Sequence, residues 1–283
     1  MEIQLLAIPY DSGNRGVRMG AGPEALLEAG LPRALGEAGH RVHVKIAELP
    51  EDAWHAEIQT GFELMRMLSR AVREAREKNR LPIVLAGNCN TSVGTVAGLG
   101  SDSTGVVWFD AHADFNTPET TRSGFLDGTA LAILTGRCWT QLAATVPDFT
   151  PIPEARVCLV GARHVDSLES VLLDDSKVQI VAPNHVRSSL RQALASMSEH
   201  AESVYVHLDL DVLDSGVAAA NTFAIPGGLM LDDIEYALSQ IAQMFRIAGI
   251  ALTAYDPAAD TDGAAARAAI RLISTAATLA GQS

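Results

Sequence analysis

Short apolar runs alternate with amphipathic stretches along the chain. Runs of about four to eight apolar residues are typical of buried strands, and apolar residues at every third or fourth position are typical of helices that face a core. Strands are predicted at residues 3–9, 42–46, 82–86, 106–109, 156–160, 178–181, 204–208 and 247–254. Helices are predicted at residues 23–38, 53–79, 129–137, 187–201, 231–246 and 263–279, with another from residue 93. Because strands that are apolar throughout and separated by helices form a parallel sheet covered on both faces, we expect an α/β protein.

Two of these strands end in side chains that bind metals. One runs into residues 110–114 (Asp-Ala-His-Ala-Asp), and another runs through residues 207–214, which carry three aspartates. The carboxyl ends of parallel strands share one edge of the sheet, where ligands bind. Like charges crowded at that edge repel one another unless a cation lies between them, so we interpret the two blocks as one polynuclear metal site. The alternative is a helix N-cap cluster, but a cap needs only one carboxylate.

The composition disfavours several classes of protein. The chain has 283 residues, 48% of them hydrophobic, which suffices for one large or two small α/β domains. No apolar run has transmembrane length and the N-terminus has no basic region, so neither a membrane partner nor a secretory signal is expected. The three cysteines, Cys89, Cys138 and Cys158, suggest neither a disulfide framework nor a zinc finger, which favours a cytoplasmic location. The net charge of −13 disfavours a nucleic-acid partner and favours a small ligand.

The motifs together resemble those of the ureohydrolases, the family of arginase and agmatinase, over nearly the whole chain. Residues 110–114 resemble the family's DAHxD motif, residues 207–214 resemble (S/H)xDxDxxDP, and residues 87–92 (GNCNTS) stand where the family has GGDHS. The resemblance implies a single domain over residues 1–283, with a three-layer α/β/α arginase-like fold and a mainly parallel sheet of about eight strands. It also implies a manganese-dependent amidinohydrolase with two Mn²⁺ ions. Since family members usually form trimers or hexamers, a homo-oligomer is among the expectations.

The resemblance also implies six metal-ligand positions. In this sequence they are Asn90, Asp110, His112, Asp114, Asp209 and Asp211, and all but Asn90 match the family pattern. By resemblance, Asp110 and Asp209 bridge the two ions. The family has a histidine where we align Asn90, and because a carboxamide oxygen is a weaker, neutral donor, the metal on that side is expected to bind less tightly. Cys89 in the same loop could act as a soft ligand, although a small buried side chain is the simpler interpretation.

Two further segments, residues 116–124 and 161–169, resemble the arginase segments that hold the substrate's α-carboxylate and α-amino group. The substrate-binding residues implied are Asn116, Thr121, Ser123, Asp166 and Glu169. Agmatine, which lacks the carboxylate, would not use the first segment, so we expect a small α-amino acid substrate. For the acidic pair in the second segment, a solvated loop face is the alternative.

Departures from the arginase pattern suggest which α-amino acid is the substrate. Besides Asn90, Asp127 stands in place of the histidine that arginases use as a proton shuttle, and Ala254 in place of a glutamate that pairs with the guanidinium. Phe125 replaces an asparagine at the end of the carboxylate-binding loop. Without the glutamate, the site should favour a less basic guanidine, and N-hydroxylation lowers guanidine basicity. A weakened metal site would also coordinate the N-hydroxyl group less.

These departures lead to the hypothesis that the chain hydrolyses Nω-hydroxy-L-arginine to L-ornithine and hydroxyurea. Such an enzyme would resemble the arginase-like enzyme of D-cycloserine biosynthesis. A hydroxide bridging the metal ions would attack the guanidine carbon. Asp114 would carry the proton to the leaving amine, while Asp127 would assist or hydrogen-bond the substrate.

Three other functions stay open at this point. The first is an ordinary arginase that tolerates the altered ligand and releases urea. The second is a non-catalytic arginase-like binding protein, which the departures support and the retained carboxylates oppose. The third is a two-metal phosphoesterase, which is weaker because no basic cluster near the motifs would hold a phosphate.

Overall fold

The backbone is organised around one sheet of parallel strands. The computed structural model describes residues 1–50 and 56–282. In these residues the sheet has eight strands in the order β4-β1-β5-β10-β9-β6-β7-β8, and every neighbouring pair is parallel. The strands are β1 Glu2–Ile8, β4 Arg41–Ile46, β5 Leu81–Ala86, β6 Thr104–Phe109, β7 Val157–Val160, β8 Gln179–Val181, β9 Ser203–Asp209 and β10 Arg246–Thr253. The expectation of a mainly parallel sheet of this size is confirmed.

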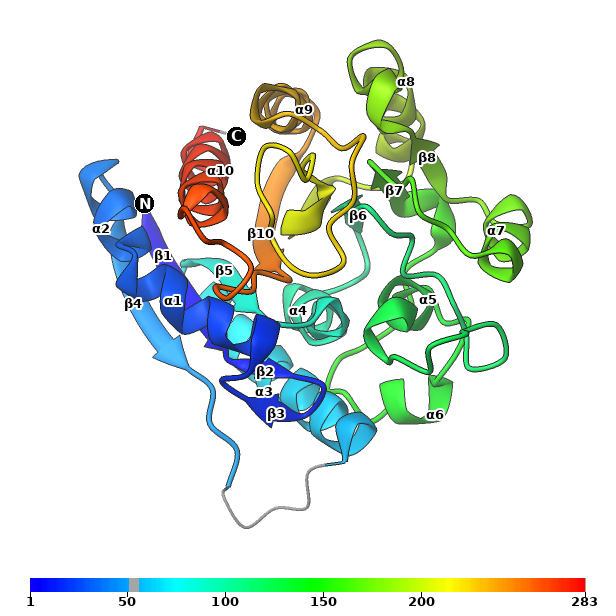
Figure 1. Cartoon of the computed structure of the whole chain (residues 1–283), viewed down its shortest axis with the longest axis horizontal. Helices are drawn as coiled ribbons and strands as arrows, with labels where there is room; N and C mark the ends of the chain where they lie inside the picture. Colours follow the sequence, from blue (N-terminus) through cyan, green and yellow to red (C-terminus); the bar gives the residue numbers. More distant parts are fainter. Residues whose placement is uncertain (51–55, 283) are drawn as a thin grey trace.

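Helices cover both faces of this sheet and make three layers (Figure 1). One apolar core packs against helices α1 (Gly22–Glu28), α2 (Leu31–Glu37), α8 (Val186–Ser198), α9 (Leu231–Met244) and α10 (Ala264–Ala280). The other packs against α3 (Glu57–Glu77), α4 (Ser92–Leu99), α5 (Ala130–Leu134), α6 (Thr140–Ala143) and α7 (Ser167–Asp174). In Figure 1, α8, α9 and α10 lie along the upper side of the sheet, and α3 to α6 along the lower side.

The apolar strands supply both cores because successive side chains point to opposite faces of a sheet. In β6, Val107 and Phe109 belong to the first core, whereas Val106 and Trp108 belong to the second. All four side chains are fully buried. This explains why the sequence shows a continuous apolar run here and not an alternating one.

The strand order brings the candidate loops to one place. Strands β5, β10, β9 and β6 are consecutive neighbours in the sheet. Their carboxyl ends lead into residues 87–92, 254–257, 210–214 and 110–114, respectively. Ligands of such sheets bind beyond the carboxyl ends of the strands, so the fold itself assembles the predicted site.

Several predicted element boundaries differ from the structure. The helix expected at 23–38 is two helices, because Gly30 adopts a left-handed conformation (φ 101°) and the next helix begins at Leu31, with Pro32 in its first turn. Helices α6 and α7 were not predicted, nor was the antiparallel hairpin of β2 (Tyr10–Asp11) and β3 (Asn14–Arg15). The helix expected from residue 53 is seen from Glu57, and its predicted start lies outside the described residues. None of the described helices is long and apolar enough to span a membrane.

Candidate active site

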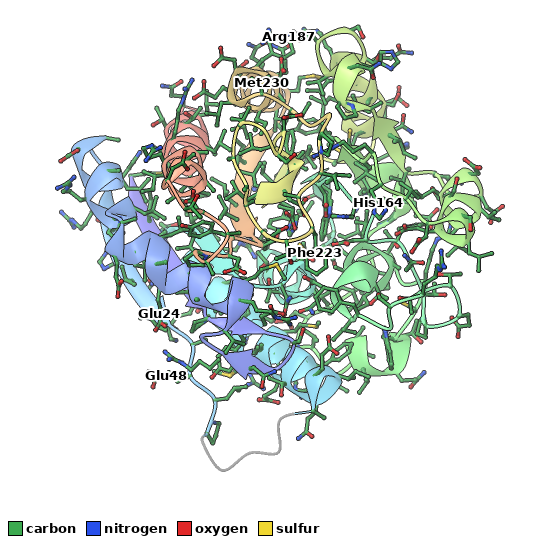
Figure 2. All side chains as sticks on the ribbon, viewed as in Figure 1. Glu24, Glu48, His164, Arg187, Phe223 and Met230 are labelled. Atoms are coloured by element: carbon green, nitrogen blue, oxygen red, sulfur yellow. The ribbon has the colours of Figure 1, made fainter. Side chains whose placement is uncertain are left out.

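A cavity of about 600 Å³ opens at the carboxyl ends of the central strands. It receives side chains from the loops after β1, β5, β6, β7, β9 and β10. Two of its lining residues, His164 after β7 and Phe223 after β9, are labelled in Figure 2. The deep part of the cavity is acidic, since Asp114, Asp209 and Asp211 all line it.

The first group of possible metal ligands is Asp110, His112 and Asp211. One ligand atom from each lies within 4.8 Å of the others. The Nδ1 atom of His112 is 3.4 Å from a carboxylate oxygen of Asp110 and 3.4 Å from one of Asp211. Burial opposes protonation of His112, but these two carboxylates outweigh it and raise the pKa of His112 to about 12. The two carboxylates therefore favour a positive charge beside them, as they would favour a cation.

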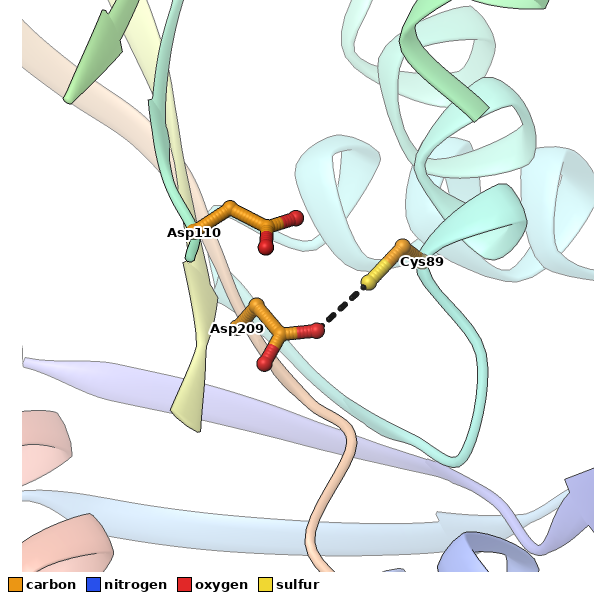
Figure 3. Close-up of side chains that lie close together, drawn as sticks. All are labelled: Cys89, Asp110 and Asp209. Carbon is orange, nitrogen blue, oxygen red and sulfur yellow. Dashed lines mark hydrogen bonds between the residues drawn. The ribbon is translucent and has the colours of Figure 1, made fainter. Parts of the chain in front are cut away.

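The second group is Cys89, Asp110 and Asp209, and it shares Asp110 with the first (Figure 3). The Cys89 thiol donates to Asp209 Oδ2 at 3.0 Å. Burial raises the pKa of Cys89, and the neighbouring Asp209 raises it further. Burial also raises the pKa of Asp209 and of Asp110. Buried acids crowded without a counter-charge favour their neutral forms, which is the situation that bound cations relieve.

Cys89, and not Asn90, is brought to the carboxylates. Cys89 lines the cavity and belongs to the second ligand group, whereas Asn90 does not line the cavity. Asn90 as a metal ligand stays a prediction from the sequence, and a register shifted by one residue offers a second candidate. When residues 86–89 (AGNC) are aligned with Gly-Gly-Asp-His, the cysteine takes the place of the histidine. That second register also keeps a donor side chain at the sixth position.

Asp114 lies close to these groups but belongs to neither. It is buried and lines the cavity, and its backbone is left-handed (φ 49°). Its carbonyl oxygen accepts from the amides of Leu131 and Ala132 at the start of α5. Burial and the nearby Asp110 hold its pKa well above the usual value.

Asp127 lines the cavity from the 3₁₀ turn η3 (Asp127–Thr129) that precedes α5. Its two oxygens accept from the backbone amide of Asn90 at 2.8 Å and from Asn88 Nδ2 at 2.9 Å. Burial raises the pKa of Asp127 to about 7, although both hydrogen bonds favour the carboxylate. It is thus a buried acid that can change charge near neutral pH.

Ala254 lines the same cavity immediately after β10. Its backbone is left-handed (φ 61°), and its carbonyl oxygen accepts from Asn221 Nδ2 at 2.8 Å. The side chain offers only a methyl group, so this position adds no charge to the cavity.

Most of the residues predicted to bind the α-amino and α-carboxylate groups of the substrate line the cavity. Asn116, Ser123, Asp166 and Glu169 line the cavity, whereas Thr121 does not. The Thr121 hydroxyl accepts from the Gly124 amide at 3.2 Å and so stabilises its own loop. Whether these residues contact a substrate stays a prediction.

Glu169 has a local structural task as well. It is buried, and its oxygens accept from the amides of Phe115 at 2.8 Å and Asp166 at 3.1 Å. The second bond belongs to a capping box at the start of α7. The alternative of a solvated face therefore does not describe Glu169, while Asp166 is half-buried.

Sequence reasoning missed several residues of the cavity wall. They are Ser12, Arg18, Met19, Arg122, Asn221 and Phe223. Phe223 stacks on Phe125 with ring centroids 6.0 Å apart. These residues lie in loops without periodic patterns, and only the fold brings them together.

Two residues of the second motif, His207 and Asp214, make contacts that stabilise the fold. His207 is fully buried, stacks on Trp108 at 3.6 Å and accepts or donates to the Tyr205 hydroxyl at 2.8 Å. Burial lowers the pKa of His207 to about 3. Asp214 accepts from the amides of Gly216 and Gly227 and so orders the loop after β9.

Fold and site together define an α/β protein whose central strands end in a carboxylate-rich centre suited to divalent cations. Comparison with known proteins makes the class specific. The family model described as "Arginase family" matches residues 1–278. The chain therefore belongs to the arginase family.

Individual relatives agree over almost the full length. The chain is 28% identical over 296 residues to a protein named arginase from Bacillus caldovelox, covering 96% of each chain. It is 26% identical over 292 residues to a protein named arginase from Staphylococcus aureus, again covering 96% of each. The solved arginase from Bacillus cereus has the same fold, with a TM-score of 0.88 at 24% identity and 98% coverage of both chains.

Proposed function

We propose that the chain hydrolyses the guanidine group of Nω-hydroxy-L-arginine to L-ornithine and hydroxyurea. The observation that carries this proposal is Ala254, a methyl group in the cavity wall at the position that resembles the guanidinium-pairing glutamate of the family. A full positive charge on the substrate would gain no partner there. A hydroxyguanidine is less basic and can bind in its neutral form. The missing carboxylate therefore costs it less binding free energy than it costs arginine.

The donor set fits two divalent cations. Two groups of three donors share Asp110, and oxygen atoms predominate in both. Oxygen ligands suit manganese, whereas the Cys89 thiol is a softer donor. We propose Cys89, in place of Asn90, as the ligand at the sixth position. A thiolate transfers more charge to a metal than imidazole does, so a metal held there has less tendency to take up an additional oxygen such as an N-hydroxyl group.

Bound cations would supply a water of lowered pKa and would polarise the substrate. The side chains of this protein would then move protons and orient the amino acid. Asp114 is a buried acid of the cavity wall outside the two ligand groups, and in this proposal it carries a proton to the leaving amine. Asp127 offers its carboxylate to a donor of the substrate, on the same cavity wall.

The amino-acid end of the substrate would lie toward the loops after β6 and β7. Asn116 Oδ1 already accepts from the Thr120 hydroxyl at 2.9 Å, which leaves the Asn116 amide N–H groups to donate. The proposal assigns Asn116 and Ser123 to the α-carboxylate, and Asp166 to the α-amino group. Thr121, which does not line the cavity, would act by shaping the loop.

Hydrolysis of L-arginine to L-ornithine and urea is the second candidate. It is favoured by the names of the relatives, which are arginases. The two candidates share a family, a fold and a donor set, and they differ in what the substrate presents to Ala254 and Asp127. A place in D-cycloserine biosynthesis depends on the first candidate and is a prediction from the sequence.

The test is product analysis. Manganese-loaded protein is incubated separately with Nω-hydroxy-L-arginine, L-arginine and agmatine, and metal-stripped protein serves as the control. The proposal expects L-ornithine with hydroxyurea from the first substrate, less urea from the second, and no putrescine from the third. Urea from L-arginine as the dominant product would establish the second candidate instead. Absence of product from metal-loaded protein would contradict both.

A further inference from the structure

The Asp127 side chain is held by the loop between β5 and α4. Both of its hydrogen bonds come from the loop between β5 and α4, through the Asn90 amide at 2.8 Å and Asn88 Nδ2 at 2.9 Å. Asp127 itself is 6% exposed and lines the cavity. Its orientation toward the cavity therefore depends on that loop.

Asn88 is a neutral link between two buried carboxylates. Its Nδ2 atom lies 2.9 Å from Asp127 Oδ2 and 3.4 Å from Asp11 Oδ1. Its Oδ1 atom accepts from the Ser12 amide at 2.9 Å. Asp11 is fully buried and is paired with Arg18, with the guanidinium Nε 2.9 Å from Asp11 Oδ2. Among these described contacts, Asp127 has no cation of its own, so the Asn88 amide is its side-chain donor.

The backbone fixes Asn88 in this position. A Cβ atom on Gly87 would lie 2.3 Å from the Tyr10 carbonyl oxygen and 2.8 Å from the Gly20 nitrogen. The loop after β5 thus lies directly against the segment after β1, without a side chain between them. Asn88 follows at the point of contact and cannot turn away without breaking its bond to Ser12.

We propose that Asn88 is a positioning residue that holds the Asp127 carboxylate in the cavity as a hydrogen-bond acceptor, and that positions 88 and 127 form one coupled pair. An acidic residue at position 88 would set two buried carboxylates within hydrogen-bond distance, so a carboxylate at 127 requires an amide at 88. The inference rests on the proposed function, because it assigns Asp127 a substrate group that can donate. The N–OH or N–H of a hydroxyguanidine is such a group.

The test uses isosteric substitutions in the full-length, metal-loaded protein. Asn88→Asp keeps the oxygen that accepts from Ser12 but replaces the donor that faces Asp127. Asp127→Asn removes the carboxylate. In the double variant the amide at position 127 can donate to the carboxylate at position 88, so the hydrogen bond is restored with donor and acceptor exchanged. Asn79→Asp adds the same charge at an exposed turn after α3 and is the matched control. For each protein we measure the melting temperature, the amount of bound metal, and kcat and KM for Nω-hydroxy-L-arginine.

We expect Asn88→Asp to lower the melting temperature and to lower kcat about ten- to hundredfold, with a smaller change in KM, because the acceptor is displaced. The double variant should regain the melting temperature but not kcat, since the carboxylate is gone. Recovery of kcat in the double variant would overturn the proposal, because the pair would then be only structural. An Asn88→Asp variant that behaves like Asn79→Asp would overturn it too. If the wild-type protein turns over none of the substrates, the proposed function fails. The coupling is refuted separately if the change in melting temperature of the double variant equals the sum of the changes in the two single variants.

Discussion

At the scale of single residues, the site depends on which atom of the loop after β5 reaches the carboxylates. The Cys89 sulfur lies 3.0 Å from Asp209 Oδ2, while the backbone amide of Asn90 faces Asp127. Cys89 therefore presents its sulfur to the carboxylate group, and the next residue orients Asp127 through its backbone amide. The two tasks separate because successive residues of this turn point in different directions.

The assignment of Cys89 predicts a spectroscopic difference. Cobalt(II) bound to a thiolate has a near-ultraviolet charge-transfer band that cobalt bound only to oxygen and nitrogen lacks, because thiolate is the softer donor. Cobalt-loaded wild-type protein should show this band, Cys89→Ser should lose it, and Asn90→Ala should retain it. A band that survives in Cys89→Ser would show that Cys89 does not bind the metal.

Ala254 predicts a change of substrate preference. Glutamate at this position would add a charge-assisted partner for a guanidinium, worth about 1.5–3 kcal/mol, or roughly ten- to hundredfold. Ala254→Glu should therefore raise kcat/KM for L-arginine relative to Nω-hydroxy-L-arginine. Ala254→Gln has nearly the same size without the charge and is the control. An unchanged ratio in Ala254→Glu would remove the main support for the hydroxyguanidine.

His112 predicts how the metal-free protein responds to pH. Its pKa is raised from 6.5 to about 12 by Asp110 and Asp211, against the effect of burial. The protonated form is thus favoured in the folded protein, and the stability it contributes is complete below pH 6.5 and declines as the pH rises toward about 12. The difference in melting temperature between metal-free wild type and His112→Asn should shrink over that interval. A difference that grows with pH would contradict this account of the two carboxylates.

At the scale of elements, the loop after β5 is positioned by backbone packing. Gly87 and Gly20 lie at the contact between this loop and the segment after β1. The contact is tight enough that neither position has room for a side chain. Residues on both sides of it, Cys89 and Ser12, line the cavity.

Gly87→Ala should therefore damage the site through the backbone. Its Cβ would lie 2.3 Å from the Tyr10 carbonyl oxygen, so the loop has to move. We expect a lower melting temperature and loss of metal from the Cys89 side. Gly36→Ala in α2, where a Cβ would meet nothing within 4 Å, is the matched control and should be neutral or slightly stabilising. Normal metal content in Gly87→Ala would argue against this contact as the support of the site.

The elements also show what sequence could and could not predict. Continuous apolar runs such as 106–109 predicted strands, because a strand buried on both faces is apolar at nearly every position. The break at Gly30 was missed, since the apolar pattern continues through it and only the left-handed φ of 101° separates α1 from α2. The sequence alone also could not decide between Cys89 and Asn90 as the sixth ligand. A loop has no period, so a shift of one residue in a motif cannot be detected from the pattern.

At the scale of the whole molecule, the parallel order of the sheet accounts for most of the predicted site. Alternating strands and helices imply a parallel sheet, and a parallel sheet gathers its loops at one edge. The carboxylates of both motifs could therefore be assigned to one centre from the sequence. Side chains from loops without motifs, such as Asn221 and Phe223, could not be assigned, because their place depends on the paths of long loops across that edge.

The central claim is that the cavity prefers a hydroxyguanidine to a guanidinium. The most direct measurement is a competition in which manganese-loaded protein receives equal concentrations of Nω-hydroxy-L-arginine and L-arginine, and hydroxyurea and urea are quantified at low conversion. The ratio of the products then equals the ratio of the two kcat/KM values. This account predicts that hydroxyurea predominates. Urea in equal or larger amount would contradict it and would identify the protein as an arginase in activity as well as in family.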